Sequence, residues 1–274
     1  MDNPNRGMER NTMNHSIGND NHRCGCNMTY DNQGCGCNMK RNNEGCDRGT
    51  EHVDHMACEM VEMDDVETRT VRVKDDVASS PKETKEKRRG VAGMVYAFKV
   101  AGAAAAQMKN LDEVAGVAQK ALDHIRTMGV ALTPCIVPQV GEPTFSIADD
   151  AIEIGMGIHG EKGIEVRKMM TADEVADILV ERITADMPLV SGDEVSVMVN
   201  GLGATPLEEQ LIVYGRVHKL LEDKGVKVFM PHVGEFATSM EMAGLSLTIF
   251  KLDEELKALL AAPAKTPFYT NYNK

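Results

Sequence analysis

The stretch AIEIGMGIHGE at residues 151–161 is the strongest indicator of the fold, because it joins a strand to a glycine turn. Its first four residues form an apolar run that predicts a β-strand. The glycines that follow let the chain turn sharply and let a ligand approach the main chain closely. His159 lies among them, and an imidazole held there can act as nucleophile, general base or metal ligand. The alternative is an ordinary loop histidine, so the rest of the sequence has to support His159 as a candidate site.

Composition excludes several classes of protein. The chain has 274 residues and a net charge of −12, which argues against nucleic acid as a partner because phosphate binding needs a basic face. Its first forty residues contain no apolar run of the kind found in secretory signal peptides. The most apolar segment, residues 91–106, contains Lys99 and falls short of a membrane span. We therefore expect a soluble cytoplasmic protein with neither nucleic acid nor membrane as a partner.

Residues 1–52 differ in composition from the rest of the chain. They are rich in Cys, Asn and Gly and almost free of Val, Leu and Ile, so we expect a low-complexity, disordered tail. The pentapeptide CGCNM occurs at residues 24–28 and again at 35–39, and Cys46 follows. These thiols suit a soft ion such as Cu(I), whereas their spacing is too short for zinc. The alternative is a flexible tail with incidental thiols, and we assign no metal site.

Helical and strand patterns alternate through the remaining chain. Helices are predicted over residues 56–63, 91–107, 111–128, 171–183, 207–223 and 254–260, and strands over 68–73, 130–137, 151–154, 193–200, 226–229 and 245–252. Asn110 is the expected N-cap of the third helix and Gly129 its expected stop. The pattern predicts a layered α/β fold with mixed sheets.

Three further features have both an ordinary and a functional interpretation, and Cys135 has only an ordinary one. The charged run within residues 79–89 predicts an exposed loop, or else a contact with an anion or a partner. His124 and Cys135 are expected to be structural and core residues. The glycine turn at residues 200–206 superficially resembles a nucleotide loop, but it lacks the Gly-Lys-Ser/Thr ending of a P-loop. The simpler interpretation of residues 200–206 is a tight strand-to-helix turn that needs no ligand.

The chain from about residue 53 onward resembles the dihydroxyacetone-binding subunit or domain of dihydroxyacetone (glycerone) kinases. The resemblance rests on motifs that occur in the family's order: KRRGVAG at residues 87–93, KVAGAAA at 99–105, PTFSIADD at 143–150, GMGIHGE at 155–161, NGLGATP at 200–206, ATSMEMAG at 237–244 and APAKTP at 262–267. It implies a phosphotransferase of glycerol metabolism.

The resemblance also implies a chemistry for His159. In the family the matching histidine adds to the ketone of dihydroxyacetone and holds it covalently as a hemiaminal. His159 is therefore the candidate catalytic and substrate-binding residue. The phosphoryl donor of the family, ADP recharged by the phosphotransferase system or ATP with Mg²⁺, sits on a nucleotide-binding partner subunit. Nothing in this chain resembles that nucleotide module, so no cofactor is expected here, and a homodimer is the expected oligomer.

Two departures from the family pattern limit what the resemblance implies. An early Gly-Gly-Gly-Ser-Gly-His segment has no counterpart, and the position aligned with the family's base aspartate holds Thr50. We therefore expect residues 53–125 to be a remnant of the first α/β domain in a truncated or divergent member. Residues 126–274 would form the second domain, with the C-terminal tail packing back on the first. The alternatives to an active kinase subunit are a non-catalytic dihydroxyacetone sensor, or coactivator, and an inactive fragment.

Overall fold

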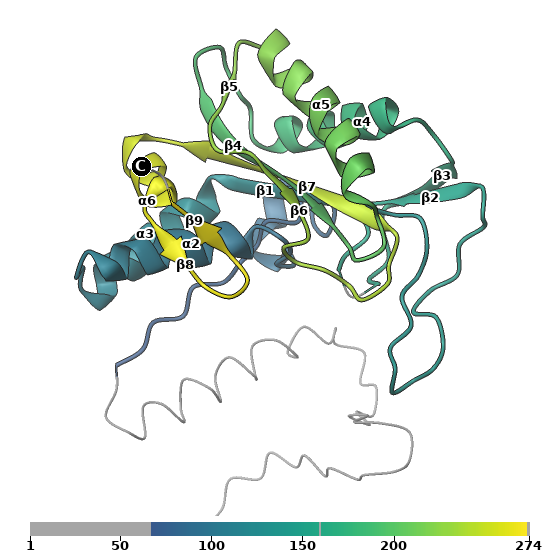
Figure 1. Ribbon diagram of the computed structural model, residues 1–274, viewed down its shortest axis with the longest axis horizontal. Coiled ribbons are helices and arrows are strands. Elements are labelled where there is room, and N and C mark those ends of the chain that lie inside the picture. Colours follow the sequence, from purple (N-terminus) through teal and green to yellow (C-terminus); the bar gives the residue numbers. More distant parts are fainter. Residues whose placement is uncertain (1–66, 159, 273–274) are drawn as a thin grey trace, which may run out of the picture. The chain divides into compact units, whose positions relative to one another are not determined.

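The fold is built on one mixed β-sheet with helices on both faces (Figure 1). The computed structural model describes residues 67–158 and 160–272. The strands of this sheet follow the order β3-β2-β1-β7-β4-β5, and β6 also pairs with β4. Their bounds are β1 Ile125–Ala131, β2 Ala151–Ile154, β3 Glu165–Lys168, β4 Glu194–Gly201, β5 Lys227–Val228, β6 His232–Gly234 and β7 Gly244–Leu252. A separate hairpin joins β8 (Ala264–Lys265) to β9 (Thr270–Asn271).

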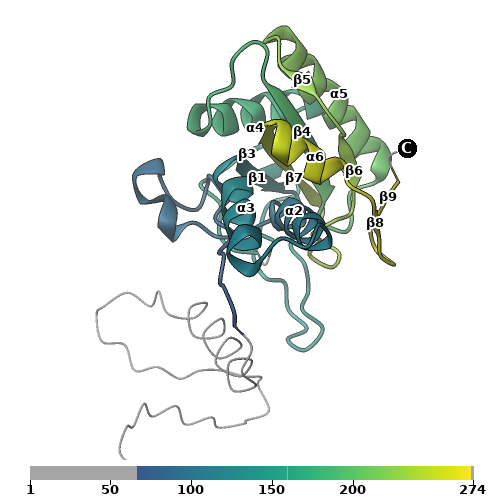
Figure 2. The ribbon, with the colours of Figure 1, turned by 90° about the vertical axis from the view of Figure 1, so that its left-hand side faces the viewer.

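The helices divide between the two faces of the sheet, as Figures 1 and 2 show from two directions. α4 (Ala172–Asp186) and α5 (Leu207–Asp223) cover one face, and α2 (Met94–Ala106), α3 (Leu111–Asp123) and α6 (Glu254–Ala261) cover the other. Alternation along β4 explains the division: Val197 and Val199 pack toward α4 and α5, while Met198 packs toward α2 and α6. The layered α/β fold with a mixed sheet is confirmed.

Strand directions follow from the connections. β7 runs antiparallel to both β1 and β4, and the parallel pair β4–β5 is joined by the crossover helix α5. β2 and β3 continue the sheet antiparallel on the far side of β1. The glycine turns at residues 155–161 and 200–206 both follow strands of this sheet directly.

Reciprocal capping pairs set the starts of α3 and α4. Asn110 accepts a hydrogen bond from the Glu113 amide while the Glu113 carboxylate accepts one from the Asn110 amide. Thr171 and Glu174 form the same reciprocal pair at the start of α4. The predicted strand at 151–154 and the helix at 207–223 are confirmed with the bounds expected.

The predicted helix at 111–128 is wrong at its end, and the predicted strand at 130–137 is wrong except for its first two residues. α3 ends at Asp123, and β1 already begins at Ile125 and passes through Gly129, which is therefore no helix stop. β1 is buried at every position, so its residues show no alternation and extend the apolar pattern of the preceding helix. His124 caps α3, and its Nδ1 lies 2.7 Å from the Lys120 carbonyl oxygen, which confirms a structural role.

The segment before α2 also differs from prediction. Residues 68–73 form no strand, and pairing along this segment is limited to a single parallel bridge between Asp76 and Thr127 of β1. The predicted exposed loop at 79–89 holds a short 3-10 helix, η1 (Lys82–Lys87), and a buried Arg88. The short strands β3, β6, β8 and β9 were not predicted. Their residues form neither an apolar run like that of β2 nor a clear alternation.

Some predictions lie outside the described residues or stay predictions. The tail at 1–52 and the helix at 56–63 fall in the undescribed part of the chain. The division into domains at residue 125 stays a prediction. No helix within residues 67–158 and 160–272 is long and apolar enough to cross a membrane.

Candidate functional site

The glycine turn after β2 lies on a small apolar cluster, which we call the loop cluster. The residues of the loop cluster are Val91, Ala131, Cys135, Met156, Ile158, Leu202 and Met242, with Met94 and Phe145 packed against it. These residues come from segments that are far apart in the sequence. Five of the seven motifs quoted above contribute to the loop cluster, and the motif at residues 155–161 contributes both Met156 and Ile158. Burial of Met156 and Ile158 anchors the turn on both sides of Gly157. His159 itself lies outside the described residues.

Glycine is required at both ends of this turn. Gly155 and Gly160 have φ values of 82° and 81°, in the left-handed region that other residues rarely adopt. The turn closes on itself, since the Gly157 amide donates to the Glu161 carbonyl oxygen and the Gly160 amide to that of Gly157. A side chain at Gly160 would also press on Thr144, 2.8 Å away. The residues on either side of His159 are thus held in one specific backbone conformation.

Arg89 joins the turn to a buried carboxylate. Its Nη2 lies 2.7 Å from Oδ2 of Asp76 and 3.4 Å from the carbonyl oxygen of Gly155. Burial raises the pKa of Asp76 above its ordinary value, although the charge and hydrogen bonds of Arg89 act to lower it. This ion pair was missed, because the charged run in which Arg89 lies predicted an exposed loop.

Asp75 is buried and fixes the backbone of the loop that contains Val91 and Gly93. Its two carboxylate oxygens each accept a hydrogen bond of 2.8 Å, from the amides of Val91 and Gly93. Burial raises its pKa above the usual value, and hydrogen bonds from Thr127 and the two amides offset part of that rise. The consecutive pair Asp75-Asp76, which follows the alternating β-branched and basic residues at 68–73, was the available signal for these roles. Buried carboxylates need partners of this kind.

The second glycine turn, residues 200–206, is braced without any ligand. The Oδ1 of Asn200 accepts hydrogen bonds from the amides of Phe236 and Ala237, both at 2.8 Å. Gly203 has a φ of 121°, and a Cβ there would overlap the carbonyl oxygen of Met240. The geometry matches the predicted strand-to-helix turn and gives no support to a phosphate cradle.

Cys135 confirms the expectation of a core residue. Its sulfur is buried in the loop cluster and lies 3.4 Å from the Ser239 hydroxyl and 3.6 Å from that of Thr144. These contacts tie residues 143–150 to residues 237–244, so a third and a fourth motif meet beside the turn that carries His159.

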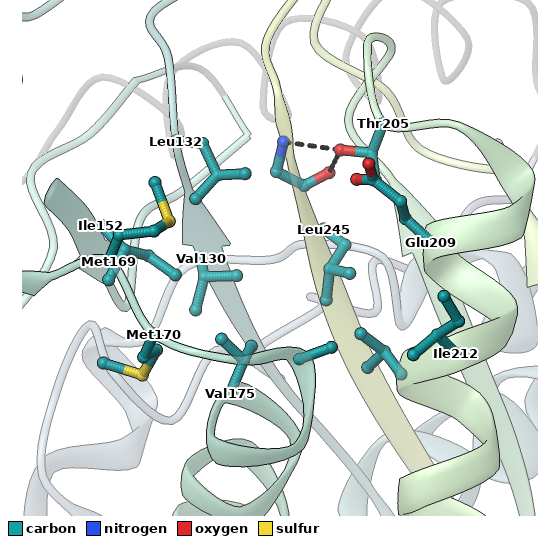
Figure 3. Close-up of a pocket in the computed structure, with 13 residues that line it drawn as sticks. Val130, Leu132, Ile152, Met169, Met170, Val175, Thr205, Glu209, Ile212 and Leu245 are labelled. Atoms are coloured by element: carbon teal, nitrogen blue, oxygen red, sulfur yellow. Dashed lines mark hydrogen bonds between the residues drawn. The ribbon is translucent and has the colours of Figure 1, made fainter. Parts of the chain in front are cut away.

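An apolar pocket of about 320 Å³ lies on the α4–α5 face of the sheet (Figure 3). Its walls come mainly from Val130, Ile152, Leu245, Met169 and Met170, and its polar groups are those of Thr205 and Glu209. Figure 3 shows the Thr205 hydroxyl bonded to both the amide and the carbonyl of Gly244. Because Thr205 is already paired and the walls are apolar, this pocket does not suit a small polyhydroxy compound.

A larger hollow of about 760 Å³ lies along α2 and the C-terminal hairpin. Aromatic side chains line it, among them Phe98, Phe236 and Phe268. Most of its lining is apolar, so it too is poorly suited to a short polyol. Within the described part of the chain, no group of three His, Cys, Asp or Glu side chains is placed to hold a metal ion.

Comparison with known proteins gives consistent matches. Residues 53–268 match the model of the Dak1 domain. The dihydroxyacetone-binding subunit DhaK of PTS-dependent dihydroxyacetone kinase 1 from Listeria innocua is 46% identical over 200 residues, which are 73% of this chain and 61% of that protein. DhaK of the PEP-dependent dihydroxyacetone kinase from Escherichia coli is 35% identical over 235 residues, covering 77% of this chain and 66% of that protein. The chain thus spans less than two thirds of the length of these relatives.

Two solved structures show the same fold. The dihydroxyacetone kinase operon co-activator Dha-DhaQ superposes with a TM-score of 0.71 and 30% identity, covering 77% of this chain and 65% of that one. The dihydroxyacetone kinase of C. freundii, in complex with AMP-PNP and Mg²⁺, superposes with a TM-score of 0.72 and 27% identity, covering 81% of this chain and 40% of that one. A kinase and an operon co-activator therefore share this fold.

Proposed function

The chain belongs to the Dak1 domain family, and from that premise we propose that it binds dihydroxyacetone through a covalent bond to His159. The observation that carries the proposal is the convergence of the family's motifs on the loop cluster, directly under the turn that contains His159. The backbone on either side of His159 is fixed, because Ile158 is buried and Gly160 has a φ of 81°.

The proposed step is an addition without a leaving group. A nitrogen of neutral His159 attacks the carbonyl carbon of dihydroxyacetone, and the π electrons of the carbonyl move to its oxygen. The imidazole N–H proton is then lost and the oxygen gains a proton, which leaves a neutral hemiaminal with all atoms of both reactants. The bond selects short ketones over glycerol, because glycerol has hydroxyls but no carbonyl to attack.

Intact mass measurement under mild conditions, without borohydride, tests the adduct. Incubation with dihydroxyacetone is expected to raise the mass of the wild-type chain by one dihydroxyacetone, and dilution is expected to reverse the change. His159→Ala should abolish the adduct. His218→Ala is the matched control, since His218 is exposed on α5 and far in sequence from every motif. An equal adduct in all three proteins would place the reaction elsewhere.

We further propose that the bound substrate receives a phosphoryl group from a partner subunit that carries the nucleotide and Mg²⁺. The support is family membership: the DhaK relatives are named as dihydroxyacetone-binding subunits, and the C. freundii kinase was crystallised with AMP-PNP and Mg²⁺. The part of this chain that belongs to the family contributes the substrate-holding half of such a reaction.

A second candidate function is a dihydroxyacetone sensor without turnover. Two observations favour it: the similar structure described as an operon co-activator, and Thr50 at the position aligned with the family's base. Lack of a general base costs about two to four powers of ten in rate. A coupled assay with a nucleotide-binding subunit and glycerol-phosphate dehydrogenase separates the two. The sensor is expected to keep the His159 adduct and to form dihydroxyacetone phosphate that much more slowly than a DhaK relative, whereas equal rates would support the kinase subunit.

A further inference from the structure

The larger hollow, which we call the α2 hollow, leaves large apolar side chains uncovered. One stripe of α2 lines it, from Met94 through Phe98 and Gly102 to Ala106. Phe268, in the turn between β8 and β9, lines it as well. Phe98 is 69% exposed and Phe268 is 63% exposed, so no residue of the described chain covers them. A contiguous apolar surface of this kind marks a contact site for another polypeptide segment.

Small residues shape the α2 hollow for a helix. Gly102 lies inside α2, where glycine costs about 1 kcal/mol relative to alanine. A Cβ at Gly102 would meet nothing within 4 Å. Ala106 follows one turn later on the same side of α2. Because the side chains at a contact set the distance between two helix axes, these small residues let a second helix approach α2 closely.

Lys99 gives the α2 hollow a preference for an acidic occupant. It is the one charged side chain among the described residues that line the hollow. Its Nζ donates to the carbonyl oxygen of Leu259 at 2.8 Å. Burial lowers the pKa of Lys99 below its ordinary value, and no carboxylate of the described chain offsets that effect. A half-buried ammonium in apolar surroundings is stabilised by a counter-charge, so an occupant with carboxylates fits best.

The described chain begins close to one end of the α2 hollow. Arg69 is its third residue, and Nε of Arg69 lies 2.7 Å from Oδ1 of Asp112 in the first turn of α3. Only residues 108–111 separate Asp112 from Gln107, which lines the hollow just after the end of α2. Residues 1–66 therefore join the described chain within a short distance of the hollow.

The sequence of residues 53–66, which lie outside the described residues, matches the hollow in polarity and charge. Val53, Met56, Met60 and Met63 recur at spacings of three and four residues, so they share one face of an α-helix. Methionine fills irregular apolar gaps, and its sulfur packs favourably against aromatic rings. The segment contains five carboxylates and neither Lys nor Arg.

We propose that residues 53–66 form a helix whose Val and Met stripe packs into the α2 hollow of the same chain. A helix from Val53 to Met63 is about 15 Å long, close to the roughly 18 Å that α2 spans along the hollow. In this arrangement the methionines contact Phe98 and Phe268, and the carboxylates surround Lys99. The contact is of the helix-in-groove kind, and it covers an apolar surface that would otherwise favour aggregation.

Hydrogen exchange, followed by mass spectrometry on the full chain, tests the contact. An isolated helix of this length is marginal in water, so strong protection of residues 53–66 requires packing. The segment is expected to exchange at least about tenfold more slowly in the wild-type chain than as a free peptide. Gly102→Leu fills the hollow and is expected to abolish the protection. Gly116→Leu is the matched control, because Gly116 on α3 is also exposed with open space around it.

A second pair of variants tests the segment itself. Met60→Glu puts a charge on the apolar stripe and is expected to abolish the protection, whereas Glu62→Gln, on the opposite face of the helix, should preserve it. Unchanged exchange of β1 and β7 in the same spectra shows that each variant is folded.

Three results would overturn the proposal. In the first, residues 53–66 of the wild-type chain exchange as fast as the free peptide. In the second, Gly102→Leu protects the segment as well as wild type does. In the third, protection grows with protein concentration, which would show that the segment of a second copy fills the hollow. No ligand is needed, so the outcome is independent of the His159 chemistry.

Discussion

The guanidinium of Arg89 forms an ion pair with Asp76 directly beneath the turn that carries the candidate site. Both Nε and Nη2 of Arg89 contact the same carboxylate oxygen, at 3.0 and 2.7 Å, and Nη2 also lies 3.4 Å from the Gly155 carbonyl oxygen. Asp76 is almost wholly buried, while Arg89 keeps a quarter of its side chain exposed. This pair links the segment before α2 to the glycine turn after β2.

Arg89→Lys tests this link. A lysine cannot present two donors in the fork of a guanidinium, so one hydrogen bond to Asp76 and the contact with Gly155 are lost. We expect the free energy of unfolding in urea to fall by about 1 to 2 kcal/mol, because a buried carboxylate loses a charged partner bond. The amount of His159 adduct should fall as well.

Arg216→Lys is the matched control for that change. Arg216 also makes two hydrogen bonds to one carboxylate, that of Asp177, at 2.8 and 3.1 Å. These two side chains are 34% and 45% exposed, against 25% and 2% for Arg89 and Asp76. Exposed ion pairs contribute little, so the cost should stay below about 0.5 kcal/mol. Equal losses in both variants would show that the link to the glycine turn has no special role.

Gly203 tests the second turn. Its φ of 121° and its close approach to the Met240 carbonyl leave no room for a methyl group. Gly203→Ala is expected to lower the free energy of unfolding by at least about 2 kcal/mol. Gly215→Ala is the control, because Gly215 lies on α5 with open space around its Cα. Helix propensity predicts a gain of up to about 1 kcal/mol there, and a loss in both variants would refute the turn argument.

A buried triad of charges predicts a pH dependence. Asp186 at the end of α4 accepts hydrogen bonds from Arg88 at 2.6 and 3.0 Å and from Arg126. Burial acts to raise the pKa of Asp186, but the hydrogen bonds and charges of the two arginines outweigh it and lower the pKa from 3.8 to about 2. The ionised form is therefore favoured in the folded state, and its stabilisation is present above pH 3.8 and lost as the pH falls toward 2.

Asp186→Asn should lower the free energy of unfolding by about 3 kcal/mol at pH 7, because two buried arginines lose their counter-charge. The difference from wild type should shrink as the pH falls from about 4 toward 2, in step with protonation of Asp186. Asp223→Asn, which removes an exposed pair with Lys219, is the control and should cost less than about 1 kcal/mol. A difference for Asp186→Asn that stays constant with pH would contradict the triad.

Local chemistry made much of the fold predictable from the sequence. The capping pairs at Asn110 and Thr171 marked helix starts, and glycine turns marked the ends of β2 and β4. β1 could not be found in this way, because a strand buried on both faces has no alternating pattern and extended the apolar stripe of α3. β3 was not recognised either, because its four residues, three of them charged, form neither an apolar run nor a clear alternation.

The candidate site was also predictable only in part. Residues in the motifs were identifiable, and their loops do meet in the loop cluster. The roles of Arg88, Arg89 and Asp75 could not be identified from the sequence. Whether a charged side chain is buried depends on its partners, which lie about a hundred residues away or on another loop. The role of His159 stays a proposal, because that residue lies outside the described part of the chain.

Covalent binding of dihydroxyacetone to His159 is tested most directly by following the ketone carbon of dihydroxyacetone. Dihydroxyacetone labelled with carbon-13 at its carbonyl is mixed with the wild-type chain and with His159→Ala, and carbon-13 NMR spectra are recorded. We expect a protein-bound signal of a tetrahedral carbon attached to nitrogen and oxygen in the wild type, and no such signal in His159→Ala. A carbonyl signal unchanged by wild-type protein at saturating concentration, or the same tetrahedral signal in His159→Ala, would contradict it.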